Sequence, residues 1–582
     1  MMERSQQRLR IALAVSLLLC TQISAARVTI RFEGLNEELQ AAARNNLEMQ
    51  QYAERPLSTS QVNRLFAKAD DEIRLALQPY GYYHAQVEGD LAAGEKEGEY
   101  RATFKVTLGE PVHIASSSVV VDGDAAKLPA IEHAIETFRP KVGERLEHGI
   151  YEGSKSNLTN LLQANGFFDA NLERHRVEVL KSANTAAIDL KWTSGERYRF
   201  GDVTFSEVQF PEEFLRRYVP WEPDAYYSID DLLTLQQRLV DADYFSSVSV
   251  QPDLAHKADG RVPIDTLLVP AKRTIYTAGA YVSTDTGPGA RVGMERRWLN
   301  QRGHKAGGQL AYSQRLEEYS AFYRIPRPGL QQRNYSFGIG YRDEQTESSR
   351  SRMARASASE VRDEWHGFTR TLGLQYLNGD FTIADEQRAT NLLYADTSIA
   401  RKRADDLLFP TRGISLLYGL RFAAETLLSD TSFVQARAEA KWVRPASKQS
   451  RLIMRAALGA MMVSDFDALP PELRFFAGGD RSVRGFDYQE IGEVNAAGGV
   501  IGGKYLTVAS VEYEYYFVPN WGAAVFVDAG DAYSSEFNLN VGAGVGVRWR
   551  SPVGIVRLDV GVPVVSDLSD TIRFHIVIGP DL

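Results

Sequence analysis

From about residue 275 onward, apolar and polar residues alternate in long segments that are separated by Gly, Asp, Asn and Pro. An alternation of period two predicts β-strands with one apolar and one polar face. Clear examples are Val434, Ala436, Ala438, Ala440 and Trp442 opposite Gln435, Arg437, Glu439 and Lys441, and the final segment with Ile572, Phe574, Ile576 and Ile578 opposite Arg573 and His575.

A soluble β-sandwich also alternates, so the pattern alone leaves two architectures open. The number of long segments, the aromatic residues at their ends and the need to close a sheet in lipid favour a transmembrane barrel. Residues 274–582 have room for roughly 16 antiparallel strands of transmembrane length, an even number as bacterial barrels prefer.

The first half has a different pattern, in which leucines at helical spacing precede an aromatic pair. Three segments resemble one another: Gly81-Tyr82-Tyr83, Gly166-Phe167-Phe168 and Asp243-Tyr244-Phe245. Leucines at this spacing dock a helix on a sheet, and Gly accepts the left-handed turn that ends the helix. The third copy has Asp243 in place of Gly.

A second landmark recurs at nearly the same offset, with Gly109-Glu110 in the first copy and Gly195-Glu196 in the second. Each copy begins with a predicted strand, at residues 28–32, 119–121 and 203–205. The predicted order of elements in each copy is therefore β-α-α-β-β. We therefore expect α+β domains at residues 27–107, 108–194 and 195–273, followed by the barrel at 274–582.

The N-terminus predicts a secretory signal peptide at residues 1–26. Arg4, Arg8 and Arg10 precede an apolar run at 11–19, which is too short to cross a bilayer, and small residues end at Ala26. Cys20, the only cysteine, lies in this segment. The mature chain is then expected to have no thiol.

Composition and charge exclude some functions. A net charge of −9 gives no general attraction to nucleic acid, and the nine histidines show no metal-ligand spacing. We expect no nucleic-acid partner, no metal and no cofactor.

Residues 478–486 (GGDRSVRGF), 526–530 (FVDAG) and 510–513 (SVEY) are motifs in the barrel half. Together with the β-α-α-β-β units, which resemble polypeptide-transport-associated (POTRA) domains, they resemble the BamA/TamA superfamily of outer-membrane assembly factors. The resemblance implies that residues 478–486 form the sixth extracellular loop and that its Arg-Gly-aromatic tip folds back into the barrel.

Strand parity independently places Glu512 and Asp528 on the lumen face. A buried Arg484 needs paired acceptors, and these two carboxylates supply them. The expected clasp comprises Arg484, Gly485, Phe486, Glu512, Asp528 and Gly530, with Glu514 in reserve. Gly542, Gly544 and Gly546 share one strand face and leave room for the inserted loop.

Residues 281–288 (YVSTDTGP), 298–300 (WLN) and 408–413 (LFPTRG) resemble the TamA-type branch, as does the count of three POTRA domains. This resemblance implies a non-enzymatic activity, the assembly or insertion of outer-membrane proteins such as autotransporters. It implies as partners client outer-membrane proteins, outer-membrane lipid and a TamB-like protein anchored in the inner membrane.

The expected mechanism uses a weak barrel seam between the first and last strands. Pro580 has no N–H to donate and Gly579 permits a bend, so strand pairing should fail near this end. A client strand would add to the exposed edge by backbone hydrogen bonding.

Two alternatives remain open at this stage. A two-partner secretion transporter is expected to have two POTRA domains and a plug helix, and a barrel-embedded hydrolase would need a nucleophile beside a histidine such as His366 or His575. A passive porin does not explain the three tandem domains.

Overall fold

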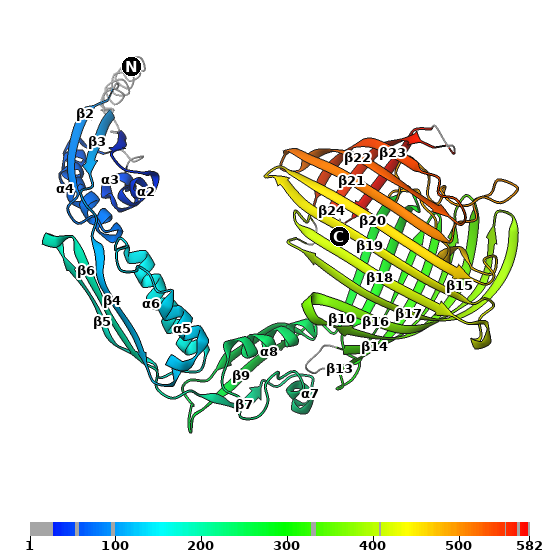
Figure 1. Cartoon of the computed structure of the whole chain (residues 1–582), viewed down its shortest axis with the longest axis horizontal. Helices are drawn as coiled ribbons and strands as arrows, with labels where there is room; N and C mark the ends of the chain where they lie inside the picture. The colour runs from blue at the N-terminus through cyan, green and yellow to red at the C-terminus, as the bar shows by residue number, and fades with distance from the viewer. Residues whose placement is uncertain are drawn as a thin grey trace, which may run out of the picture. The chain divides into compact units, whose positions relative to one another are not determined.

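The structure is a computed structural model that describes residues 27–52, 57–94, 99–327, 333–406, 409–552, 554–566, 568 and 571–579. The expected signal peptide and Pro580 lie outside the described residues. Figure 1 colours the α+β domains blue to green and the barrel strands green to red. Among the helices of the described segments, none has the length and apolar character needed to span a bilayer.

Three α+β domains precede the barrel, each with helices between its first and second strands. The first contains β1 (Arg27–Glu33), α2 (Glu37–Asn46), α3 (Glu48–Gln51), α4 (Thr59–Leu77), β2 (Gln86–Ala93) and β3 (Glu99–Thr107). The second contains β4 (His113–Asp122), α5 (Pro129–Glu136), α6 (His148–Ala164), β5 (Asn171–Leu180) and β6 (Thr185–Thr193). The third contains β7 (Arg199–Phe205), α7 (Glu212–Arg216), α8 (Ile229–Asp241), β8 (Phe245–Pro252) and β9 (Arg261–Pro270).

The three sheets share one topology, with strand orders β1-β3-β2, β4-β6-β5 and β7-β9-β8. In the first two, the opening strand pairs parallel to the last and the middle strand pairs antiparallel to it. The repeated order confirms the predicted β-α-α-β-β unit in three copies.

Helix α4 illustrates how the local sequence builds these domains. Ser58 caps its N-terminus, and Gln61 returns a hydrogen bond to complete a capping box. Val62, Leu65 and Ile73 recur at helical spacing on its buried face. They pack in the same core as the sheet residue Phe104.

The second half is a closed barrel of sixteen consecutive antiparallel strands, β10 to β25 (Figure 1). The strands are β10 (Thr274–Ser283), β11 (Gly287–Arg296), β12 (Lys305–Ser313), β13 (Leu316–Arg327), β14 (Arg333–Gln345), β15 (Ser349–Asp363), β16 (Phe368–Ile383), β17 (Glu386–Ala404), β18 (Gly413–Ala423), β19 (Phe433–Ser447), β20 (Ser450–Val463), β21 (Tyr505–Val518), β22 (Trp521–Tyr533), β23 (Asn540–Ser551), β24 (Gly554–Val565) and β25 (Arg573–Gly579). The strand number confirms the prediction from length and alternation.

Strand parity follows the sequence pattern. On β21, Glu512 and Glu514 are buried in the lumen, whereas Val511 and Tyr513 face outward and are 50% and 40% exposed. The outward face therefore suits lipid, and the inward face carries charge.

The long connection between β20 and β21, residues 464–504, is called loop six here. Its apolar side chains Val483, Phe486 and Ile491 are fully buried. They pack with inward-facing residues in the extracellular halves of the strands, such as Phe381 of β16 and Tyr394 of β17. Loop six thus forms an apolar core with these strands inside the lumen, called the apolar plug below.

Candidate functional site in the barrel lumen

Arg484, at the tip of loop six, is 3% exposed and bound by three carboxylates. Its Nε and Nη2 donate to the two oxygens of Asp528 at 2.7 and 3.1 Å. Its Nη1 donates to Glu512 at 2.7 Å and to Asp559 of β24 at 3.0 Å. The fork to Asp528 uses the planar guanidinium geometry that a lysine lacks.

Two further contacts hold the tip against β22. The backbone N–H of Arg484 donates to Asp528 Oδ2 at 3.1 Å. The guanidinium carbon lies 3.5 Å from the centre of the Phe526 ring, a cation–π contact. Side chain and backbone of Arg484 are therefore both fixed by this strand.

A second arginine balances the same carboxylates from the barrel wall. Arg548 of β23 is fully buried and donates to Glu512 at 2.6 Å, to Glu514 at 2.8 Å and to Asp559 at 2.5 Å. Glu514 also accepts from Arg451 of β20 at 2.6 Å. The buried charges thus form a network that alternates in sign and spans five strands and loop six, as buried charges require.

Glycines on β23 let loop six approach the wall. A Cβ on Gly542 would lie 1.8 Å from the Arg484 carbonyl oxygen, and one on Gly546 would lie 1.8 Å from Asp559 Oδ1. On β24, a Cβ on Gly561 would lie 2.7 Å from the Gly485 nitrogen. Bare backbone at these positions leaves the space that the tip and its carboxylates occupy.

His575 of β25 joins the tip to the last strand. The Gly485 N–H donates to His575 Nε2 at 3.0 Å, so Nδ1 carries the ring proton and donates to Asp480 at 2.8 Å. Asp480 also accepts from Ser283 at 2.8 Å and from Thr284 at 2.5 Å, at the end of β10. Loop six thereby connects the first and last strands.

The strands themselves are joined weakly at this seam. Within the described part of the chain, β10 and β25 share one backbone pairing, Ser283 with Val577, whereas β10 pairs with β11 along its whole length. A cavity of about 930 Å³ lies beside β10 and is lined by Gly279, Tyr281, Val577 and Tyr488 among others. Most of the β10 edge therefore faces a cavity.

The expected clasp residues are placed as follows. Arg484, Glu512 and Asp528 come together, Gly485 adopts φ +98° against Val562 of β24, and Phe486 is buried in the apolar plug. Gly530 lies on β22, and the atoms nearest to a Cβ there belong to Thr507 and Val508 of β21. Gly530 thus shapes the neighbouring strand contact, not the Arg484 site.

The expected seam residues are only partly described. Gly579 ends β25 and pairs with Ile555 of β24. Pro580 lies outside the described residues. The reserve candidate Glu514 pairs with Arg548 and Arg451.

Sequence reasoning did not assign Asp559, Arg548, Asp480 or His575 to this site. Parity could have pointed to Asp559, because Arg557 and Asp559 alternate with Leu558 and Val560 on β24. No sequence signal links Asp480 to His575, which are 95 positions apart.

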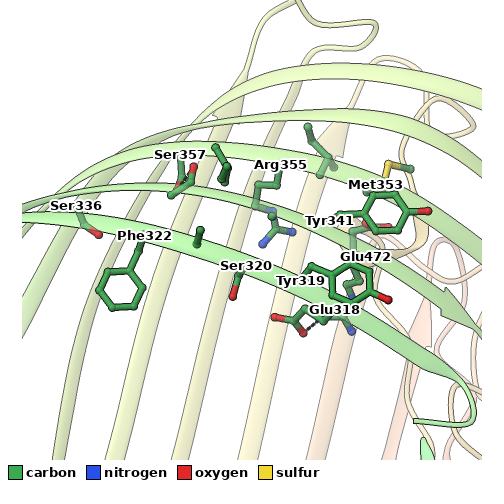
Figure 2. Close-up of a pocket in the computed structure, with 16 residues that line it drawn as sticks. Glu318, Tyr319, Ser320, Phe322, Ser336, Tyr341, Met353, Arg355, Ser357 and Glu472 are labelled. Carbon is green, nitrogen blue, oxygen red and sulfur yellow. Dashed lines mark hydrogen bonds and ion pairs between the residues drawn. The ribbon is translucent and has the colours of Figure 1, made fainter. Parts of the chain in front are cut away.

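A second lumen cavity, of about 260 Å³, lies against β13, β14 and β15. Figure 2 shows Glu318 of β13, Arg355 of β15 and Glu472 of loop six among the residues that line this cavity. Its lining carries both signs of charge and several serines, without a histidine. The lining therefore contains no serine–histidine pair of the kind that serine hydrolases use.

The histidines considered for a hydrolase lie apart. His366 is in the turn between β15 and β16, whereas His575 contacts Asp480 and the loop tip near the opposite ends of the strands. Ser283 donates to Asp480, which lies between it and the ring. Among the described residues, no cluster of His, Cys, Asp and Glu could hold a metal ion.

A closed antiparallel barrel with a loop folded into its lumen, preceded by three α+β domains, defines an outer-membrane protein with a periplasmic POTRA arm. Residues 289–581 match the Omp85 superfamily domain. Residues 29–108 match the first POTRA domain of TamA, and residues 198–268 match the surface antigen variable number repeat. The chain belongs to the Omp85 superfamily, as a member of the BamA/TamA type.

Similar proteins agree with this family. Outer membrane protein assembly factor BamA of Nitratidesulfovibrio vulgaris is 29% identical over 192 residues, 31% of this chain and 24% of that protein. Sorting and assembly machinery component 50 homolog A of Xenopus laevis is 25% identical over 305 residues, 49% of this chain and 64% of that protein. The chain thus spans less than two thirds of each relative.

Among solved structures, BamA from Haemophilus ducreyi lacking POTRA domains 1-3 has the same fold. The TM-score is 0.67 at 16% identity, and the alignment covers 80% of this chain and 99% of that one.

Proposed function

We propose that this protein is the outer-membrane subunit of a translocation and assembly module and promotes insertion of other outer-membrane proteins, autotransporters among them. The printed names of both relatives, an assembly factor and an assembly machinery component, support an assembly role. The match of residues 29–108 to the first POTRA domain of TamA supports the TamA-type branch.

The observation that carries the proposal is the single pairing of Ser283 with Val577 between β10 and β25 in the described chain. A strand edge with free backbone groups is a template for another strand. The cavity of about 930 Å³ beside β10 leaves room for one on the lumen side. In this proposal, a client strand pairs with β10 before it leaves into lipid.

The clasp has a mechanical role in this proposal. The contacts of Arg484 with Glu512, Asp528 and Asp559 hold loop six against β21, β22 and β24. Those strands then stay rigid while the seam opens. Gly579 and Pro580 act as the hinge of the last strand.

The arm belongs to the same proposal. Its domains, bounded at residues 27–107, 108–194 and 195–273, receive clients in the periplasm together with a TamB-like partner, and outer-membrane lipid surrounds the seam. The proposed activity is non-enzymatic and the signal peptide is removed on export.

A disulfide across the seam tests the proposal. Ser283→Cys with Val577→Cys, made in a Cys20→Ser background in cells without the native copy, joins residues that face each other in the barrel. Surface delivery of an autotransporter should fall to the level of cells lacking the protein and recover with reductant. The control pair Ala280→Cys and Ala290→Cys links β10 to β11 and should leave delivery intact.

Full delivery by a quantitatively cross-linked seam would overturn the proposal. Loss of delivery in both cross-linked proteins would also overturn it, because the effect would then not depend on the seam.

A further inference from the structure

The aromatic turn that ends each domain's last helix also contacts the part of the chain that comes next. In the first domain, Tyr82 accepts a hydrogen bond from Arg145 at 3.0 Å, and the Tyr83 hydroxyl lies 2.8 Å from His148 Nε2. A Cβ on Gly81 would lie 2.7 Å from the Leu146 carbonyl oxygen. The glycine thus admits the backbone of the second domain.

The second domain repeats this arrangement. The ring of Phe168 packs on Tyr227 at 4.8 Å and on Tyr198 at 5.8 Å. Asp169 accepts from the Tyr198 hydroxyl at 2.7 Å and pairs with Lys257. A Cβ on Gly166 would lie 3.0 Å from the Tyr198 carbonyl oxygen, so the approach again needs glycine.

In the third copy the next part of the chain is the turn between β11 and β12 of the barrel. The Tyr244 hydroxyl is buried and donates to the Gly303 carbonyl at 2.6 Å. Lys305 donates to the Ala242 carbonyl at 2.8 Å and lies 4.8 Å from the centre of the Tyr244 ring. Phe210 meets Trp298 edge to face at 6.2 Å.

Asp243 has φ +60°, in the left-handed region where the other two copies have glycine. Aspartate is among the few residues that tolerate this conformation. Its carboxylate accepts from Arg297 Nε at 3.0 Å and lies 3.9 Å from Lys305 Nζ. A side chain at Gly81 or Gly166 would collide with the next domain. At the equivalent position of the third domain, the Asp243 side chain instead contacts two cationic side chains of the barrel.

We infer that Asp243 and Tyr244 are positioning residues that lock the α8–β8 turn to the β11–β12 turn of the barrel. The ion pair alone is weak, because the Asp243 side chain is 47% exposed. The buried hydrogen bond from the Tyr244 hydroxyl to the Gly303 carbonyl is the stronger contact. Without it, the carbonyl oxygen would be left buried and without this partner, which is costly. The joint needs both residues.

Spin labels on the full-length protein in detergent test this joint. One label is placed at Leu233 of α8 and the other at Val518, at the periplasmic end of β21; both are exposed. Pulsed electron–electron double resonance then gives the distribution of distances between the two labels. We expect a narrow distribution in the parent, a broader one in Asp243→Gly or Tyr244→Phe, and the broadest in the double variant.

Matched variants control for nonspecific loosening. Asp259→Gly removes another aspartate of positive φ, and Tyr227→Phe removes another buried tyrosine hydroxyl of the third domain. Both should keep the narrow distribution. If the double variant fails to fold, Arg297→Ala tests the ion pair from the barrel side. A double variant as narrow as the parent, or controls that broaden equally, would overturn the inference.

Discussion

Asp480 in loop six accepts a hydrogen bond from His575 in the last strand at 2.8 Å, although 95 positions separate them. The same carboxylate accepts from Ser283 and Thr284 of the first strand. One side chain therefore ties both edges of the seam to the loop, at the place where the two strands share their one described backbone pairing.

Asp480→Asn should loosen the seam without removing the clasp at Arg484. The amide cannot serve equally as acceptor for His575, Ser283 and Thr284, and a buried group that loses its partner costs about 1–3 kcal/mol. We expect a lower midpoint of heat-induced barrel unfolding on gels. Asp465→Asn, elsewhere in the loop, is the control. An unchanged midpoint in Asp480→Asn contradicts the seam role.

Arg484→Ala should destabilise the barrel strongly. It leaves Asp528, Glu512 and Asp559 with one cation fewer, and breaking a buried pair in this way costs about 3–5 kcal/mol. Arg484→Lys should recover only part, because an ammonium cannot form the fork to Asp528. Urea unfolding in lipid vesicles measures both effects.

Autotransporter delivery measured on the same Arg484 variants tests the clasp. It should fall in both while the barrel still forms. Val494→Ala truncates an exposed side chain of the same loop and should behave as the parent. Normal delivery by both Arg484 variants would contradict the proposed role of the clasp.

Gly542→Ala should expel the loop tip. The added methyl group would lie 1.8 Å from the Arg484 carbonyl oxygen, and overpacking typically costs about 1–3 kcal/mol or more. Protease cleavage within loop six should increase. Gly279→Ala on β10 adds the same methyl group where no atom lies within 4 Å and should leave cleavage unchanged. Equal protection of both variants is the contrary outcome.

Asp285, in the turn between β10 and β11, predicts a pH dependence. Burial and the neighbouring Asp480 carboxylate raise the pKa of Asp285 to about 7 from its ordinary value of 3.8. A raised carboxyl pKa stabilises the fold while the group is protonated. That stability is complete below about pH 4 and is lost as the pH rises through about 7.

Asp285→Asn stays neutral, so its unfolding midpoint should vary less than that of the parent between acidic and neutral pH. Parallel pH profiles for the parent and Asp285→Asn would contradict the prediction.

The sequence predicted the architecture because its signals are local or periodic. Alternation placed Glu512 and Asp528 in the lumen, and three recurring turns gave the number of arm domains. It could not choose the partners of Arg484, since Asp559 and Arg548 reach it only when the sheet closes. The hydrogen bond between Asp480 and His575 depends on the same closure. The contacts of Asp243 with Arg297 and Lys305 depend on the position of the α8–β8 turn against the barrel.

The apolar plug affects whether ions can pass through the barrel lumen. Side chains such as Phe486, Phe381 and Tyr394 form an apolar barrier in the extracellular half of the lumen, where an ion would lose its hydration without gaining a partner. The strand residues of the plug belong to β15 through β22, and none of its described members lies on β10 or β25. A barrel built in this way can have a loose side wall and still present a high electrical resistance, so planar-bilayer recordings of the parent should give little steady conductance.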